Sequence, residues 1–188
     1  TDLWDLDFVL TGSQKALALP PGLALGVAHP RALERAKATK HRGIYFDLVE
    51  FENYIVKNQT PNTPALSLMY ALAAQVERID NETMEVRWAR HRDMAHHTWT
   101  WAQQQQAKGR DVRVLAPEGF RSPTVTCLTV PAGRRGGEVN DAMKARGFTI
   151  SAGYGSLKDT TIRIGHMGDH DVAELDVLLH ALDEVLAA

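Results

Sequence analysis

The sequence has little that would cross-link the chain or give it a strong charge. Its 188 residues include a single cysteine, Cys127, which excludes a disulfide framework within the chain and fits a reducing, cytoplasmic compartment. Lysine and arginine number 21 against 23 acidic residues, a formal net charge of −2. Proteins that bind nucleic acids usually carry a basic excess, so we expect no nucleic-acid partner.

Long apolar runs, internal repeats and low-complexity tracts are also missing. No run approaches the roughly 20 residues of a membrane span, and no signal-like segment opens the sequence, so we expect no membrane partner. Hydrophobic residues make up 44% and charged residues 23%, an ordinary globular composition. The first residue is Thr rather than Met. We take this to indicate a trimmed, cleaved or partly visible chain.

One lysine occupies an unusual place. The apolar run 8–10 predicts a buried strand, and the stretch 20–22, Pro-Pro-Gly, predicts a tight irregular turn. Lys15 lies between them. Burial there would favour its neutral amine, the form that condenses with an aldehyde to a Schiff base. Ser13 and Gln14 would offer donors to an anionic cofactor tail. Alternatively, the lysine extends into solvent and its neighbours only build a turn.

A second candidate segment is the stretch 59–64, Gln-Thr-Pro-Asn-Thr-Pro. Its Thr-Pro end predicts the start of a helix. Helix starts offer free N–H groups and a positive dipole end, which suit a phosphate. Thr60 and, more weakly, Gln59 are therefore candidate phosphate contacts. A plain capping turn is the alternative.

Arg163 is the third candidate. It closes a predicted apolar strand at residues 161–164, with Gly165 and Gly168 nearby. A guanidinium can hold a carboxylate through two parallel hydrogen bonds, which lysine cannot reproduce. We therefore expect an anchor for a substrate carboxylate. The alternative is an arginine paired with a structural acid.

These three segments together resemble the class V pyridoxal-phosphate-dependent aminotransferases, in particular the alanine–glyoxylate and serine–pyruvate group. Thr11–Leu17, followed by the Pro-Pro-Gly turn, resembles the segment of the cofactor-binding lysine. The stretch 59–64 is similar to the phosphate-contacting turn, and Arg163–Gly168 to the carboxylate-binding segment. They occur in the family's order and extend across almost the whole chain.

The resemblance implies an α/β and α+β chain of fold type I, the C-terminal half of such an enzyme. The Schiff-base lysine lies near the middle of these enzymes, whereas here it is residue 15. Residues 1–80 would be the C-terminal part of the large pyridoxal-phosphate-binding domain with the interdomain helix, and 81–188 the small α+β domain. The family's phosphate turn reaches the neighbouring subunit, which implies a homodimer with a shared active site. A missing N-terminal half would hold the remaining cofactor contacts.

The implied activity is transamination between a small amino acid (alanine, serine or aspartate) and a 2-oxo acid (glyoxylate or pyruvate). Lys15 would be catalytic; Lys15, Ser13, Gln14, Gln59 and Thr60 would hold the cofactor, and Arg163 the substrate. A phosphoserine aminotransferase is an alternative that would call for extra basic groups, for example Arg42 or His41. An inactive, cofactor-free fragment is another.

The remaining histidines and the cysteine predict no further chemistry. His91, His96 and His97 lack the i,i+4 spacing that places two imidazoles on one helix face, so we expect no metal. His166 and His170 are four apart, but in a loop. Cys127 falls within a predicted strand, whereas the cysteine desulfurases of this fold need an exposed thiol on a loop.

Hydrophobic periodicity and capping residues predict the elements. Strands are expected at 8–10, 23–28, 112–115, 124–130, 148–150 and 161–164. Helices are expected from Pro30 to a stop at Gly43, from 63 to about 79, from a cap at Asn81 to Gly109, over 138–146, and from Asp169 or Asp171 to the end. Residues 44–57 are expected to be a connecting segment.

Overall fold

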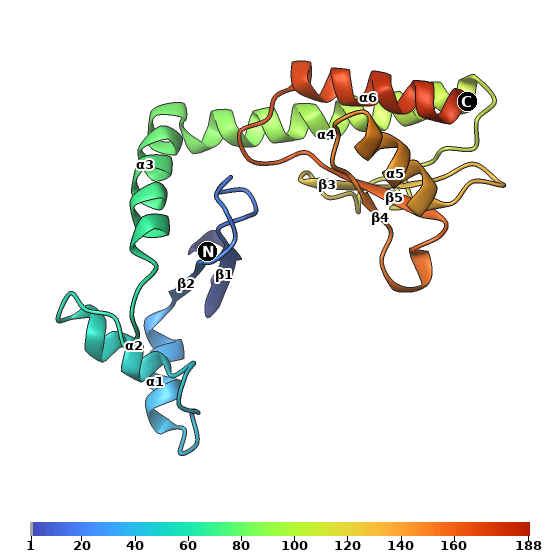
Figure 1. Cartoon of the computed structure of the whole chain (residues 1–188). Coiled ribbons are helices and arrows are strands. Elements are labelled where there is room, and N and C mark those ends of the chain that lie inside the picture. Colours follow the sequence, from blue (N-terminus) through green and yellow to red (C-terminus); the bar gives the residue numbers. More distant parts are fainter. Residues whose placement is uncertain (1) are drawn as a thin grey trace. The chain divides into compact units, whose positions relative to one another are not determined.

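The computed structural model describes residues 2–188 (Figure 1). The chain divides into two compact units, Thr1–Arg78 and Ile79–Ala188. The assignment of 1–80 to a large cofactor domain and of 81–188 to a small domain stays a prediction.

The first unit contains a two-stranded antiparallel ribbon. A short 3-10 turn, η1 (Asp2–Trp4), precedes β1 (Phe8–Gly12), which pairs with β2 (Ala24–Ala28). Both strands were predicted, but the burial predicted for the first is wrong. Leu10 in β1 is 70% exposed, because a two-stranded ribbon needs a further layer to cover its faces.

Two short helices follow. Helix α1 (Pro30–Ala38) begins with proline at its first position, as predicted, and ends at Ala38 rather than near Gly43 because Thr39 turns extended. Helix α2 (Leu48–Ile55) was not predicted. Asp47 caps it by accepting the Val49 N–H at 2.9 Å, so the expected connecting segment is half helical.

Two long helices follow the short ones. Helix α3 (Leu66–Glu82) begins three residues after Thr63 and continues past the predicted end. The cap of α4 (Met84–Ala107) is Thr83 rather than Asn81, which lies inside α3. The chain leaves α4 through Gly109, which has a φ of +81°, as expected for a glycine after a helix.

The second unit is a three-stranded antiparallel sheet with helices packed on it. The strand order is β3 (Val125–Thr129), β5 (Thr161–Gly165), β4 (Ser151–Ala152). The predicted strand at 112–115 is reduced to one bridge, Val114 to Leu128, and the strand predicted at 148–150 forms later, as β4. A 3-10 turn, η2 (Gly155–Leu157), precedes β5.

Helices α4, α5 (Gly136–Ala145) and α6 (Val172–Ala187) supply the helical side of this core. Asp171 caps α6 by accepting the Glu174 N–H at 2.9 Å. Figure 1 shows the three helices on one side of the sheet. Their buried residues and those of the strands belong to one hydrophobic core. The core residues include Met94, Val139, Met143, Leu179, Leu182, Leu128, Ile162 and Ile164.

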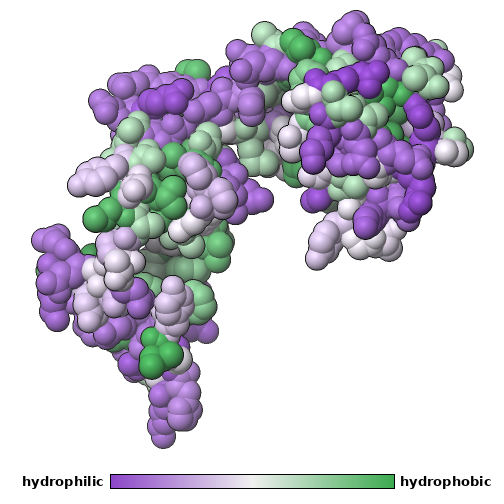
Figure 2. Space-filling model, in the orientation of Figure 1, coloured by the Kyte–Doolittle hydropathy of each residue, from purple (hydrophilic) through white to green (hydrophobic). Residues whose placement is uncertain are grey.

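The two units differ in how much apolar surface they bury. Among the described residues, every buried hydrophobic side chain of the core lies at Ile79 or beyond. Most of the exposed large hydrophobic side chains lie in the first unit, and Figure 2 shows apolar side chains gathered on its visible face. The second unit therefore has a core of its own, and the first does not. None of the described helices is long and apolar enough to cross a bilayer.

Candidate functional site

The loop that carries Lys15 is built on Ser13. Its side chain is fully buried, and its hydroxyl donates to the Pro20 carbonyl at 2.7 Å and accepts the Leu23 N–H at 3.2 Å. Its backbone N–H donates to the Leu23 carbonyl, and its carbonyl accepts the Leu19 N–H, both at 3.0 Å. All polar groups of Ser13 are thus engaged within the turn, which is the alternative weighed for this residue.

Lys15 lies in this turn with a fixed backbone and an exposed side chain. Its N–H donates to the Gly12 carbonyl at 3.2 Å, and its carbonyl accepts the Ala18 N–H at 2.9 Å. The burial that was expected to neutralise the amine is not found in this chain, because β1 itself is exposed. Within the described residues, the Lys15 amine has no hydrogen bond or ion pair, so it is accessible to a reactant.

Gln14 and Gln59 also keep their side-chain amides free of hydrogen bonds within residues 2–188, and both are exposed. The Gln14 side chain folds over Gly12, where an added Cβ would lie 2.6 Å from its Oε1. A side chain at position 12 would therefore require this exposed glutamine to move. The two glutamine amides remain available as donors to an anion.

Thr60 does not lie where the sequence placed it. Helix α3 begins at Leu66, so Thr60 is six residues ahead of it and outside its first turn. The Thr60 hydroxyl donates to the Asn62 carbonyl at 2.7 Å. Phosphate binding through the helix start is therefore not supported at Thr60, because the dipole effect is confined to the first turn.

Arg163 occupies the middle of β5, the central strand, rather than its end. In the ladder it lies opposite Cys127 of β3 and opposite Ser151 of β4. Its neighbours in the strand, Ile162 and Ile164, are buried in the core. Arg163, Cys127 and Ser151 therefore form a row on the other face of the sheet. We call this row the arginine row.

The Arg163 guanidinium is oriented by a backbone carbonyl and pairs with no carboxylate of residues 2–188. Its Nε–H donates to the Ala152 carbonyl at 3.0 Å. No carboxylate within the described part of the chain forms an ion pair with it, so the structural acid weighed as an alternative is not found there. Its terminal nitrogens remain available to a ligand carboxylate in the two-bond geometry that arginine favours.

A buried chain of hydrogen bonds secures the opposite face of the same strands. Trp99 Nε1 donates to Thr126 Oγ1 at 2.9 Å, Thr126 Oγ1 lies 2.8 Å from His166 Nε2, and His166 Nδ1 lies 3.1 Å from the Pro123 carbonyl. A carbonyl can only accept, so Nδ1 carries the proton and Nε2 accepts from the threonine. Burial lowers the pKa of His166 and keeps the ring neutral.

Helix α4 holds the loop that follows β5. Arg87 and Arg90 both pair with Glu82 at 2.7 Å, Arg87 also pairs with Asp169 at 3.0 Å, and Arg90 donates to the Gly168 carbonyl at 2.9 Å. Arg87 is 3% exposed, so these pairs satisfy a buried charge. Sequence reasoning missed this cluster because two of its members, Gly168 and Asp169, lie about 80 residues beyond the two arginines. Among residues 2–188 no group of three His, Cys, Asp or Glu side chains is placed to hold a metal ion.

Comparison with known proteins gives relatives along almost the whole chain, although no protein-family model matches it. A serine–glyoxylate aminotransferase of Arabidopsis thaliana is 34% identical over 179 residues, which are 94% of this chain and 43% of the relative. The small subunit of a soluble hydrogenase of Synechococcus sp. is 32% identical over 189 residues, 99% of this chain and 47% of the relative. The chain spans about half the length of the curated relatives it matches.

Solved structures of aminotransferases are also similar to this chain. An alanine–glyoxylate aminotransferase of Nostoc sp. superposes with a TM-score of 0.88 at 25% identity, over 98% of this chain and 49% of that one. A phosphoserine aminotransferase of Cytophaga hutchinsonii gives 0.87 at 24% identity, over 97% and 50%, a likeness of fold alone. The fold is therefore that of the pyridoxal-phosphate-dependent transferases of fold type I. Within that fold, curated relatives that match the chain at 30% identity or more are named aminotransferases, and the chain aligns with less than half of their length.

Proposed function

We propose that this chain is the part of a pyridoxal-phosphate-dependent aminotransferase that supplies the Schiff-base lysine and the carboxylate-binding arginine. The reaction transfers an amino group between alanine, serine or aspartate and glyoxylate or pyruvate. The observation that carries the proposal is the Lys15 amine, exposed and unpaired within the described residues, on a backbone fixed by the Ser13 turn. The single cysteine is consistent with a cytoplasmic site of action.

The side chains proposed to bind the cofactor suit it, except that Ser13 and Thr60 are already engaged with backbone carbonyls. Lys15 would hold the cofactor covalently, and the free amides of Gln14 and Gln59 are the better donors to its phosphate. The Ser13 and Thr60 hydroxyls would first have to give up the carbonyls they already bind. Ser13 therefore stabilises the loop through its hydrogen bonds within the turn.

When bound, the cofactor supplies the electron sink for the charge left at the substrate α-carbon. The chain's own contribution is position and proton transfer. The Lys15 amine is the base that would take the α-proton and return it. Arg163 would bind the α-carboxylate and so orient the α-carbon.

The phosphoserine alternative finds less support. Its substrate carries a dianionic phosphate and needs further free cations. Arg42, one candidate for that role, is held by Asp47 through its Nε at 2.9 Å. A cation already paired in this way is a weak anchor for a second anion.

A second polypeptide segment completes the proposed enzyme. The first unit exposes large apolar side chains, among them Phe8, Leu10 and Tyr70, and has no core residue of its own among those described. We propose that the half of the relatives that this chain does not match covers this surface. That cover would also supply the burial that Lys15 lacks here. We further propose a homodimer in which the turn at Gln59 reaches the neighbouring active site.

The test is to produce the chain together with the complementary half of the Arabidopsis relative and add pyridoxal phosphate. We expect an absorbance band at about 420 nm. After borohydride reduction, peptide mass spectrometry should find the cofactor on Lys15. A Lys15→Ala variant should fold and lose both signals, whereas Lys57→Ala, a second exposed lysine of the same unit, should keep them.

Turnover of alanine or serine with glyoxylate then separates the possible outcomes. Cofactor on Lys15 with turnover supports the aminotransferase. Cofactor found on another lysine contradicts the role of Lys15. A complete assembly that never binds the cofactor supports the inactive-fragment alternative instead.

A further inference from the structure

We infer that Ser151 is a second substrate contact, which donates a hydrogen bond to the carboxylate held by Arg163. This inference rests on the proposed function, because it assumes that the arginine row receives a small carboxylic acid. It begins from the ladder, in which Ser151 of β4 and Arg163 of β5 lie directly opposite each other. Directly opposed residues of antiparallel strands have Cβ atoms roughly 5 Å apart on the same face.

The guanidinium leans toward Ser151 rather than toward Cys127. Both residues flank Arg163, one on each neighbouring strand. The Arg163 Nε–H, however, donates to the carbonyl of Ala152, the residue next to Ser151 on β4. The side chain is thereby drawn over β4, and its terminal nitrogens are brought to the strand that carries the serine.

Ser151 is also free to act. Its side chain is exposed, and its hydroxyl forms no hydrogen bond with any residue that the structure describes. Ser13 gives the contrast, since it is buried and its hydroxyl is fully engaged. A hydroxyl carries one donor and can turn it toward an anion.

The two residues form a three-donor site for a small carboxylate. Two terminal N–H groups of Arg163 meet the two carboxylate oxygens in parallel, and the Ser151 O–H donates to one of those oxygens. Along β5, the preceding position on the same face, Thr161, is closed, because its hydroxyl donates to the Leu157 carbonyl of η2 at 2.8 Å and the residue is buried. This face therefore has room for a short acid at Arg163 and not for one extended along the strand toward Thr161.

The first test uses the full 188-residue chain without cofactor, because the second unit has its own core. The probe is pyruvate, and the signal is the NMR resonance of the Arg163 Nε–H, assigned by its loss in Arg163→Gln. We expect a saturable shift, and a Kd raised about tenfold or more in Ser151→Ala, because one hydrogen bond to a charged group is lost. Ser151→Thr, which keeps the hydroxyl, should restore most of the affinity. Ser156→Ala, an exposed serine in η2, should bind as the unchanged chain does.

The second test uses the complete, cofactor-loaded assembly. Ser151→Ala should raise the KM for pyruvate by a similar factor and leave kcat and the cofactor absorbance band unchanged, because the hydroxyl holds the substrate and takes no part in proton transfer. An unchanged KM and Kd in an active enzyme would overturn the role of Ser151 alone. An inactive assembly with normal pyruvate binding would overturn the proposed function and leave the carboxylate site standing.

Discussion

At the scale of single residues, the chain holds its two candidate cations, Arg163 and Lys15, in different ways. Arg163 gives one N–H donor to the Ala152 carbonyl and keeps its terminal nitrogens on the free face of the sheet. Lys15 has no partner for its amine within the described residues, and only its backbone is held. Arginine stays charged in any surroundings, so Arg163 can act as soon as the strand forms. Lysine becomes a nucleophile only when its surroundings disfavour the charge, so Lys15 depends on what covers it.

The charge of Arg163 can be measured through Cys127, the only cysteine and its partner across β3 and β5. The thiol is partly exposed. We expect the rate ratio of iodoacetate to iodoacetamide at Cys127 to fall about two- to fivefold in Arg163→Gln, because the guanidinium attracts the anionic reagent. The measurement is the alkylation rate by intact mass.

Two controls define this experiment. Arg163→Lys keeps the charge and should keep most of the preference for iodoacetate. Added salt at about 1 M should reduce the preference in the unchanged chain, since it screens the attraction. A ratio that is the same with Gln at position 163 would show that the guanidinium does not face this row.

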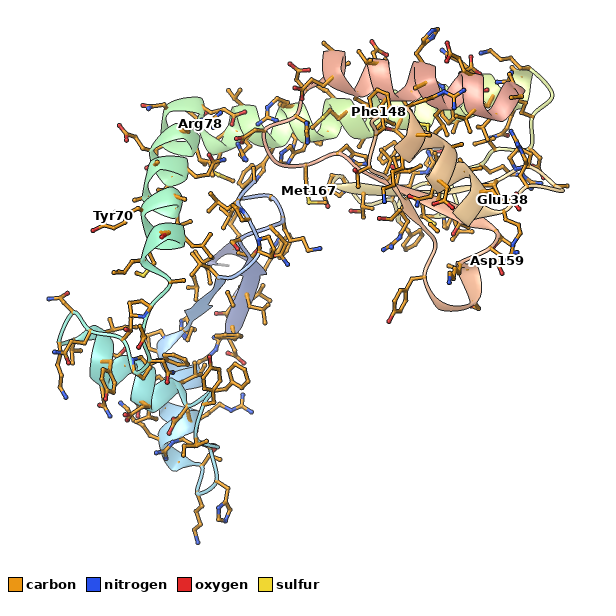
Figure 3. All side chains as sticks on the ribbon, viewed as in Figure 1. Tyr70, Arg78, Glu138, Phe148, Asp159 and Met167 are labelled. Atoms are coloured by element: carbon orange, nitrogen blue, oxygen red, sulfur yellow. The ribbon has the colours of Figure 1, made fainter. Side chains whose placement is uncertain are left out.

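At the scale of elements, β5 is fixed at its start by the beginning of α5. The start of α5 packs against the residues that lead into it, where the Gly136 N–H donates to the Asp159 carbonyl at 2.9 Å and Arg135 pairs with Asp159 at 2.9 Å. Figure 3 shows Glu138 and Asp159 in this region. The Glu138 carboxylate also accepts the Arg135 N–H at 3.2 Å. This corner fixes where β5 begins and hence the position of Arg163.

Two neighbouring glycines at this corner give a matched pair of stability variants. A Cβ at Gly136 would lie 2.2 Å from the Thr161 carbonyl oxygen, whereas a Cβ at Gly137 would meet nothing within 4 Å. Gly136→Ala should therefore lower the free energy of unfolding of the second unit by about 1–3 kcal/mol. Gly137→Ala should leave it unchanged or raise it by up to about 1 kcal/mol, because glycine is a poor helix former. Urea denaturation followed by circular dichroism measures both, and equal effects would contradict the packing of α5 on β5.

The hydrogen-bond chain at His166 makes the second unit sensitive to acid. Burial lowers the pKa of His166, and also that of His91, below the value of about 6.5 expected in the unfolded chain. The unfolded state therefore binds more protons than the folded state below this value. The contribution of the two neutral histidines to the free energy of unfolding is complete above a pH of about 6.5. It is lost as the pH falls from there through their folded pKa values.

We expect the urea midpoint of the chain to fall between pH 7.5 and 5.5, a range above the usual carboxylate pKa values. His166→Gln should be less stable at pH 7.5 but lose less on acidification, since an amide can donate to Pro123 and accept from Thr126 without titrating. The exposed His41→Gln serves as the control and should follow the unchanged chain. Identical pH dependence in the His166→Gln variant would argue against a neutral, buried His166.

At the scale of the whole molecule, the unequal distribution of the core is the main feature. The buried hydrophobic residues lie in the second unit, and the ribbon and short helices of the first expose theirs. A segment that buries little apolar surface cannot offset the conformational entropy of ordering its backbone. We therefore expect the first unit to need cover from a further segment in order to fold, and the second unit not to need it.

Truncation tests this difference. A fragment of residues 79–188 should unfold cooperatively in urea and give a dispersed NMR spectrum, whereas 1–78 should not. A fragment of 84–188 should be less stable than 79–188, because it removes Glu82 and leaves the buried Arg87 with one carboxylate fewer. A cooperative transition in 1–78 alone would contradict the need for cover.

Most of the fold was predictable, because hydrophobic period and capping residues act locally. Pro30, Gly109 and Asp171 mark helix ends where expected, and Thr161–Ile164 reads as the strand that it forms. Helix α2 was missed, since the acidic cap at Asp47 stands among aromatic residues that favour other structures. The strand predicted at 112–115 pairs at one residue only, because pairing depends on a partner strand far along the chain.

The sequence by itself determined the resemblance to the aminotransferases, the order of the three motifs and the residue types that carry charge, because these depend on identity and spacing along the chain. Only the tertiary structure decided which of those residues are free. Ser13 proved to be part of the turn, Thr60 lies outside the helix start, Lys15 is exposed, and Arg163 has Ser151 as its neighbour. The physical reason is that burial and hydrogen-bond partners arise when segments distant in sequence meet, and a local pattern does not contain that information.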